Sequence, residues 1–117
     1  MENKIYGLIG LAAKAGKLTS GGNTCEDAIK KGKAGLVIIA VDSTDNTKDK
    51  FLRIAENNRI ESRLFGSSDN LGKYCGKREK RSVIAINDKG FAERLAEIID
   101  ESTRKNGGGR IGKDQGL

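Results

Sequence analysis

The amino-terminal segment has the apolar spacing of an amphipathic helix. Its apolar residues recur at i, i+3, i+4 and i+7, which places them on one face of a helix. They are Ile5, Leu8, Ile9 and Ala12. Gly16 is suited to end this helix, and the segment Lys17–Ser20 is predicted to form a short edge strand.

A second helix is predicted from Thr24 to Lys31, with Gly32 as its end. Asn23 precedes it, and Glu26 follows Asn23 by three positions. That is the spacing of an N-cap residue with a reciprocal acidic partner, so Asn23 is predicted to cap the helix.

One apolar run has the pattern of a strand at the centre of a sheet. The run from Leu36 to Val41 shows no alternation of apolar and polar residues, so we expect both of its faces to be buried under helices. Val83–Ile86 is the clearest remaining strand, and Glu61–Phe65 is a weaker strand candidate. Strands of this kind need helices on two sides.

Three further helices follow from the same periodicity. The turn-forming run 42–47 leads into the first, Ser67 or Ser68 can cap the second, and Asp88 opens the third. The residues expected to face inward from these helices are Phe51, Ile54 and Ala55, then Leu71, Tyr74 and Cys75, and finally Phe91, Leu95, Ile98 and Ile99.

The alternation of strands and helices predicts an α/β fold, a three-layer α-β-α sandwich with a small mixed sheet. A chain of 117 residues is one domain long, and we assign residues 1–105 to it. Residues 106–117 include five glycines together with Arg110 and Lys113, so they are predicted to form a flexible, basic tail.

Composition removes several classes of function. There is no histidine, which excludes imidazole catalysis within this chain, and two cysteines without histidine are a poor zinc site. Cys25 and Cys75 are expected to be reduced thiols, with a single bridge as the alternative. The longest apolar run has six residues, far short of a membrane span. We therefore expect a soluble, cytoplasmic, monomeric protein with no cofactor, no metal and no catalytic residues.

The positive charge is concentrated in one segment. The net charge is +6, and residues 70–81 contribute a net +4. Their basic residues are Lys73, Lys77, Arg78, Lys80 and Arg81. Such a cluster attracts a polyphosphate, although a basic solvated loop is the simpler alternative.

Two polar segments precede predicted helices and can serve a phosphate or a base edge with their backbone amides. They are Gly21–Thr24 and Gly66–Gly72. The alternative for both is ordinary helix capping. Neither has the spacing of a phosphate-binding P-loop, which argues against nucleotide hydrolysis. Aromatic residues are only 4% of the chain, so recognition of structured RNA is favoured over stacking on open single strands.

Several of these motifs, taken in order, resemble the ribosomal protein L7Ae/L30e family, most closely its small bacterial members of the YlxQ type. The resemblance covers about residues 3–101. It is carried by the segments Gly10–Lys17, Gly21–Asn23, Ala28–Ala34, Leu36–Asp42, Asn46–Lys48 and Leu71–Gly72. The resemblance implies an α-β-α sandwich that binds kink-turn RNA, as a ribosomal or ribosome-associated protein.

The family motif Gly-x-Asn-Glu-x-x-Lys reads sheared G·A pairs at the start of the second helix, and a loop before the fourth helix packs on a flipped-out nucleotide. The resemblance therefore implies a site at Gly21, Gly22, Asn23, Thr24, Asp27, Lys31, Phe65, Gly66, Ser67 and Ser68, with the basic cluster beside it. Thr24 stands where the motif has Glu, and Asp27 where it has Lys. A carboxylate near phosphates is expected to cost about 1 kcal/mol, close to tenfold in affinity.

The sequence therefore predicts a non-catalytic binder of structured, bent RNA, with RNA and ribosome-associated proteins as partners and no membrane. If four to six phosphates are neutralised, log K should fall with log salt with a slope of about −3 to −5. A protein-interaction adaptor that kept the fold and lost high-affinity kink-turn binding is the alternative. An RNA-modifying enzyme is the third class, for which no residues supply a cofactor site.

Overall fold

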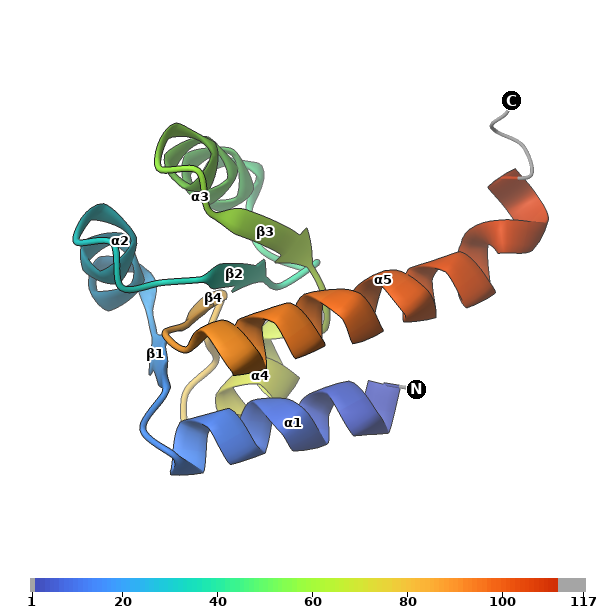
Figure 1. The fold of residues 1–117 in the computed structure, drawn as a ribbon, viewed down its shortest axis with the longest axis horizontal. Helices are drawn as coiled ribbons and strands as arrows, with labels where there is room; N and C mark the ends of the chain where they lie inside the picture. The colour runs from blue at the N-terminus through green and yellow to red at the C-terminus, as the bar shows by residue number, and fades with distance from the viewer. Residues whose placement is uncertain (1, 112–117) are drawn as a thin grey trace.

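The computed structural model describes residues 2–111 of the chain, and the side chains of residues 2–104. Five helices and four strands make up this part, as Figure 1 shows. Their order is α1 (Glu2–Lys14), β1 (Leu18–Ser20), α2 (Gly22–Lys30), β2 (Leu36–Ile39), α3 (Asp45–Asn57), β3 (Glu61–Leu64), α4 (Ser68–Tyr74), β4 (Val83–Ile86) and α5 (Lys89–Ile111).

The four strands form one mixed sheet in the order β1-β4-β2-β3. β4 is antiparallel to both β1 and β2, whereas β2 and β3 are parallel. β1, β2 and β3 therefore all run in one direction. Every residue of the two central strands is buried. For Leu36–Ile39 this confirms the prediction from the missing alternation.

The apolar run after β2 does not stay in the sheet to its end. The strand ends at Ile39, and Val41 is 52% exposed, so the expectation of burial as far as Val41 is wrong. The N–H of Ala40 still donates to Ser82 O and that of Val41 to Gly66 O, so the backbone stays beside the sheet while the Val41 side chain faces water.

Alternate residues of the central strands feed two separate cores. Leu36 and Ile38 pack with residues of α1, α4 and α5, whereas Val37 and Ile39 pack with residues of α2 and α3. Figure 1 shows the same division, with α2 and α3 on one side of the sheet and α1, α4 and α5 on the other. The predicted three-layer α-β-α sandwich is confirmed.

Two of the three predicted helix caps are present. Ser67 Oγ accepts from the N–H of Asn70, and Asp88 Oδ2 accepts from the N–H of Phe91. The prediction for Asn23 is wrong, because α2 begins at Gly22, two residues before the predicted start, with Gly21 in the N-cap position at φ 94°. A φ in this region suits glycine, so the turn is made two positions before the asparagine. Glu26 is not a capping partner either.

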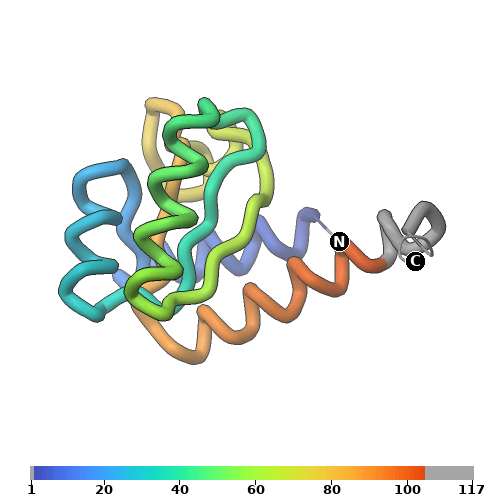
Figure 2. Tube along the Cα trace, turned by 90° about the horizontal axis from the view of Figure 1, so that it is seen from above, coloured from blue at the N-terminus to red at the C-terminus, as the bar shows by residue number. Residues whose placement is uncertain are grey.

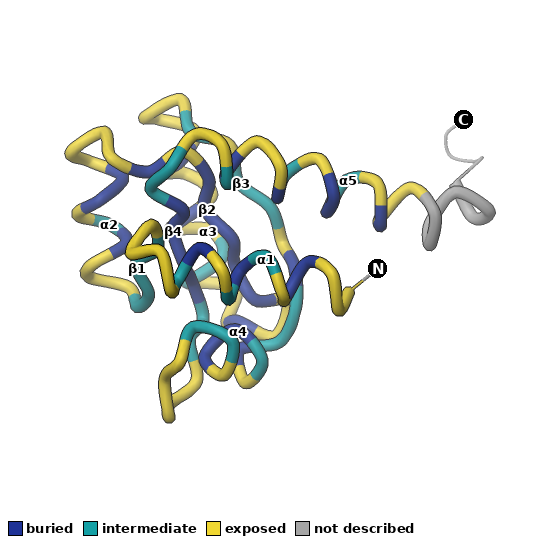
Figure 3. The backbone as a smooth tube through the Cα atoms, turned by 60° about the horizontal axis from the view of Figure 1, so that its bottom comes forward, coloured by how far each residue is buried: buried dark blue, intermediate teal, exposed yellow. Residues whose placement is uncertain are grey.

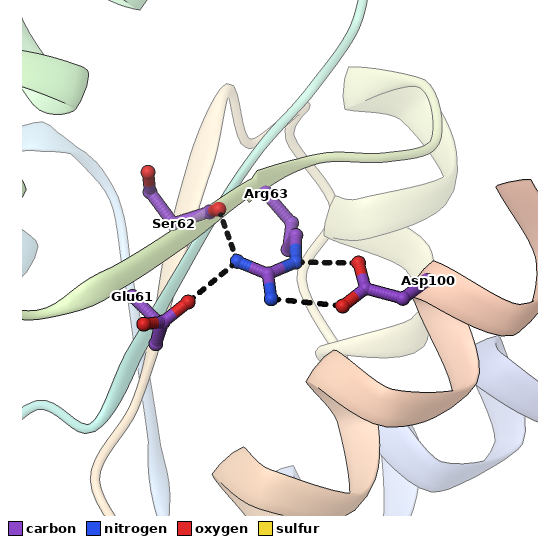
Figure 4. A network of polar contacts seen from close by, with 4 residues as sticks. All are labelled: Glu61, Ser62, Arg63 and Asp100. Carbon is purple, nitrogen blue, oxygen red and sulfur yellow. Dashed lines mark hydrogen bonds and ion pairs between the residues drawn. The ribbon is translucent and has the colours of Figure 1, made fainter.

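The long helix α5 is joined to the edge of the sheet by one arginine (Figure 4). Arg63 of β3 donates from Nε and Nη2 to the two carboxylate oxygens of Asp100, at 2.7 and 2.9 Å, and from Nη1 to Glu61 at 2.8 Å. The hydrogen bonds from Arg63 hold the pKa of Asp100 below its usual value. This bidentate geometry fixes the orientation of α5 across the sheet.

The carboxyl-terminal helix extends beyond the predicted domain boundary. α5 reaches Ile111, six residues into the segment predicted as a flexible tail from Asn106. The backbone of residues 106–111 is therefore helical, in contrast to that prediction, and residues 112–117 lie outside the described residues. The division into a domain of residues 1–105 and a separate tail stays a prediction.

Candidate nucleic-acid interface

The candidate site lies at the edge of the sheet where β1, β2 and β3 end and β4 begins. Because these three strands run in the same direction, the helices that follow them, α2, α3 and α4, all begin at this edge. Figure 2 shows the connections after β2 and β3 and before β4 gathered at one end of the molecule. Helix amino termini carry partial positive charge, so this edge favours anions.

The start of α2 exposes backbone donors. Gly22, Asn23 and Thr24 are exposed in its first turn, and no side chain among the described residues caps that turn. Their N–H groups precede the first intrahelical hydrogen bond. The turn is nevertheless fixed, because Gly21 N–H donates to Val83 O at 3.0 Å and Thr24 Oγ1 donates to Ser20 O. Asn23 thus projects from a rigid turn with its amide unused as a cap.

The loop before α4 is held from β2. Asp42, which follows β2, accepts from Ser68 N at 2.9 Å and from Ser68 Oγ at 3.1 Å. The hydrogen bond from the Ser68 backbone is the main cause that lowers the pKa of Asp42. Gly66 adopts φ 77° directly against Tyr6, whose hydroxyl would lie 2.5 Å from an added Cβ. The capping alternative for this loop is therefore correct for Ser67, which accepts from Asn70 N, whereas Ser68 begins the helix and is held by Asp42.

Arg81 joins the loop before α4 to the start of α2. Its backbone N–H donates to Ser68 O at 3.0 Å, and its Nε donates to Ser20 Oγ at 3.1 Å. Nη2 of Arg81 also lies 3.6 Å from Glu79. One residue of the basic cluster therefore links Ser68, in the segment before α4, with Ser20, the residue before the segment Gly21–Thr24, across 13 and 61 positions of the sequence.

The other basic residues surround this junction. Lys77 lines a hollow of about 310 Å³ together with Ser20 and Thr24, at the start of α2. The positive charge of Lys80 is one of the causes that lower the pKa of Asp42, which places it near the loop before α4. Arg78 is exposed in the same connection, which Figure 3 draws in yellow beyond α4.

Three predicted residues lie apart from the junction or are buried. Phe65 is only 9% exposed and packs on Tyr6 with ring centroids 5.0 Å apart, so it serves the core and offers no platform to a base. Asp27 and Lys31 lie farther along α2, where Lys31 Nζ is 3.1 Å from Asp27 Oδ2. Lys31 is about 13 Å along the helix axis from Gly22.

Two structural residues of the site were not predicted. Ser20 holds the Arg81 guanidinium and Asp42 holds Ser68. The sequence contained one usable signal for Asp42: it begins a run of turn formers directly after a buried strand, at the sheet edge where the other polar segments also lie.

The thiols do not provide a nucleophile. Cys25 is fully buried, and burial raises its pKa to about 12. Burial likewise raises the pKa of Cys75 to about 11. Both are free thiols, as expected. Within the described residues no group of His, Cys, Asp and Glu side chains is arranged to hold a metal ion. None of the described helices has the length and apolar character to cross a membrane.

The sequence is similar to a known protein family and to several of its members. The sequence model of the ribosomal protein L7Ae/L30e/S12e/Gadd45 family matches residues 3–96. The RNA-binding protein YlxQ of Bacillus subtilis is 33% identical over 95 residues, which cover 81% of this chain and 94% of that protein. The large ribosomal subunit protein eL30 of Methanoregula boonei is 39% identical over 85 residues, 73% of this chain and 86% of that protein.

A solved structure has the same fold. The structure of a Bacillus halodurans protein of unknown function superposes with a TM-score of 0.79 at 36% identity. The alignment covers 83% of this chain and 97% of that one. The likeness thus spans most of this chain and nearly all of that one.

Proposed function

Because this chain belongs to the ribosomal protein L7Ae/L30e/S12e/Gadd45 family, we propose that it binds structured RNA and catalyses no reaction on it. The supporting observation is the junction at the sheet edge. There the uncapped start of α2 and the loop before α4 are joined through Arg81, and exposed basic residues surround them. Backbone donors next to cationic side chains suit a folded phosphate backbone.

Bent RNA of the kink-turn type is the ligand we propose, with ribosomal RNA as its source, and with the chain acting as a cytoplasmic monomer. Asn23 provides the side chain for base readout, since its amide both donates and accepts and makes no cap hydrogen bond. The same RNA contacts the backbone N–H groups of Gly22 and Thr24, whereas Gly21, whose N–H donates to Val83 O, shapes the turn that presents them.

The charge at Asp27 opposes this function less than the sequence implies. Lys31 lies 3.1 Å from the Asp27 carboxylate, one turn away on the same helix face. The pair adds no net charge near the RNA, so the expected repulsion of about 1 kcal/mol is largely cancelled. This weakens the main argument for an adaptor without an RNA site.

We count the expected phosphate contacts from the basic side chains of the site that form no ion pair within the protein. Lys31 pairs with Asp27, and Arg81 is held by Ser20 and Glu79. Among the residues that the structure describes, the other basic residues of the site take part in no ion pair; they are Lys73, Lys77, Arg78 and Lys80. Four phosphates give a slope of log K against log salt of about −3, at the shallow end of the range expected from sequence.

The test is binding of a kink-turn hairpin and of a straight duplex of equal length, measured by fluorescence anisotropy over a range of salt. We expect tighter binding of the hairpin and a slope of about −3. Asn23→Ala should weaken hairpin binding about tenfold, affect the duplex little and leave thermal stability unchanged.

Asn57→Ala, at the exposed far end of α3, is the matched control and should bind both RNAs as the wild type does. A salt-independent affinity, or equal losses on both RNAs for Asn23→Ala, would refute the proposal. Partners that remain bound after nuclease treatment, with no hairpin binding, would favour the adaptor.

A further inference from the structure

A groove between α1 and α4 lies beside the proposed RNA site and is not explained by it. Its volume is about 540 Å³, within the range of clefts that hold a small organic ligand. The walls come mainly from small and apolar residues, among them Gly7, Gly10, Leu11, Ala13 and Tyr74. Figure 3 shows α1 running alongside α4, with the exposed connection to β4 at one end.

The groove exists because α1 presents small residues to α4. Gly7 and Gly10 have no side chain, and a Cβ on Gly10 would already be in van der Waals contact, 3.6 Å from Tyr74 O. Tyr74 is held in place by Tyr6, with ring centroids 4.7 Å apart and an interplanar angle of 16°. Leu11, at the groove, is 58% exposed, which leaves an apolar wall facing water.

The groove continues to the start of α2. The hollow of about 310 Å³ that contains Ser20, Thr24 and Lys77 shares Ala13 and Cys75 with it. A chain molecule bound at the α2 turn therefore has a lined path along α1, without having to cross an open surface.

The charge along this path has one sign. Lys14 and Lys73 line the groove, and Lys77 lines the hollow. Of the described residues, no aspartate or glutamate lines either one. The Lys73 ammonium lies 5.6 Å from the centroid of the Tyr74 ring, so a cation stands directly over the apolar wall. An apolar floor with cations at its sides suits a single nucleic-acid strand, whose bases are flat and whose backbone is anionic.

We propose that this groove binds a short unpaired segment of the same RNA, extending from the part held at the start of α2. The extension continues past Lys73 and Lys77, which the hairpin already engages, and adds a phosphate contact at Lys14; its bases and sugars lie on the small-residue face of α1 beside Tyr74. The inference rests on the proposed function. An acidic peptide would also match the lysines, but the continuity of the groove with the α2 turn favours RNA.

The experiment compares a blunt kink-turn hairpin with the same hairpin carrying a short oligouridine extension at its 5′ or 3′ end. We expect one of the two extensions to raise the affinity of the wild type about tenfold. Leu11→Glu places a carboxylate at an exposed position in the groove and should abolish this gain, with little effect on the blunt hairpin.

Leu52→Glu is the matched control, because Leu52 is also an exposed leucine on a helix, 36% accessible, and lies on α3 in the opposite layer. It adds the same charge and should keep the gain from the extension. Circular dichroism melting of both variants verifies that they remain folded.

The outcomes separate the two proposals. If the blunt hairpin is not bound at all, the proposed function itself fails. If the hairpin is bound but neither extension adds affinity, or if both leucine variants lose the gain equally, the groove proposal is wrong and the proposed function stands. An acidic peptide that binds the wild type and not Leu11→Glu, without any gain from the extensions, would assign the groove to a protein partner and overturn the inference.

Discussion

Replacement of Arg81 by methionine tests whether this residue of the basic cluster stabilises the fold, in contrast to the basic residues that we propose contact RNA. The Arg81 side chain is 26% exposed, and it donates to Ser20 Oγ at 3.1 Å and pairs with Glu79 at 3.6 Å. Methionine keeps most of the side-chain length and removes the charge and the donors. Arg78→Met is the matched control, since Arg78 lies in the same connection and is exposed.

The expected loss of stability follows from these contacts. A hydrogen bond from a charged donor contributes about 1.5–3 kcal/mol when it is buried. A surface ion pair such as that with Glu79 contributes less than about 1 kcal/mol. With a quarter of the Arg81 side chain in water, we expect Arg81→Met to lower the free energy of unfolding by about 1 kcal/mol. Arg78→Met should stay within about 0.5 kcal/mol of the wild type.

The salt dependence of RNA binding should change more for Arg78→Met than for Arg81→Met, the reverse of the order expected for stability. A side chain that contacts a phosphate contributes about 0.7–0.9 to the slope of log K against log salt. Arg78→Met should therefore make the slope shallower by this amount, whereas Arg81→Met should weaken binding with a smaller change in slope. Urea unfolding followed by far-UV circular dichroism gives the first quantity, and anisotropy titrations of the kink-turn hairpin at several salt concentrations give the second.

Wild-type stability of Arg81→Met, together with loss of a full phosphate from the slope, would refute the reasoning. Arg81 would then be a phosphate ligand, and its contact with Ser20 would have no energetic role.

Two other substitutions, at Asp42 and Gly72, test how the loops around the site are fixed, and a third, at Gly7 in α1, tests the contrasting case of an uncrowded glycine. Because the carboxylate of Asp42 is favoured in the folded state, its contribution to stability is present above the usual pKa of 3.8 and is lost as the pH falls through the lowered value. Asp42→Asn should therefore flatten the acid limb of a plot of urea midpoint against pH, and an unchanged acid limb would contradict the role of Ser68 as its donor. Gly72→Ala should destabilise the protein by about 1–3 kcal/mol, since the added Cβ would lie 2.2 Å from Glu79 O. Gly7→Ala, which meets no atom within 4 Å in α1, should instead stabilise it by about 0.5–1 kcal/mol in the same urea titration.

The layers of this fold can be predicted from local patterns because the polarity of each residue reflects whether its own side chain is buried. Leu36–Ile39 and Val83–Ile86 contain no polar residues, as expected for strands covered on both faces, and both strands are central in the sheet. The error at Asn23 has a physical reason: asparagine is a common cap, but Gly21, two positions before it, can adopt φ 94° and makes the turn first. Capping preferences of about 1 kcal/mol cannot decide between neighbouring positions when the backbone has another solution.

The positive charge of the candidate site could be predicted from the sequence, but the hydrogen bonds and ion pairs of its individual residues could not. A net +4 over residues 70–81 is visible in the sequence, and Lys77 and Arg81 of this segment lie beside the start of α2. Which of them are engaged by the protein depends on contacts between distant segments. The link from Arg81 to Ser20 spans 61 positions, and that from Asp42 to Ser68 spans 26. No local pattern records such contacts, so Arg81 and the freely exposed Arg78 look alike in the sequence.

Contacts between distant segments also fix the backbone that carries the flexible lysine and arginine side chains of the site. The connection between α4 and β4 is fixed at Gly72, where Glu79 O passes too close for any side chain, and at Arg81, which is bonded to both neighbouring loops. Lys77, Arg78 and Lys80 lie between these two points, so their backbone is positioned before any ligand arrives. Binding then costs the ordering of the side chains but not of the loop, and each loop residue left unordered would add about 1–2 kcal/mol to that cost. The site has four cations outside any ion pair among the described residues. With so few, avoiding the cost of ordering the loop is what allows the proposed binding of bent RNA to be more than a weak electrostatic contact.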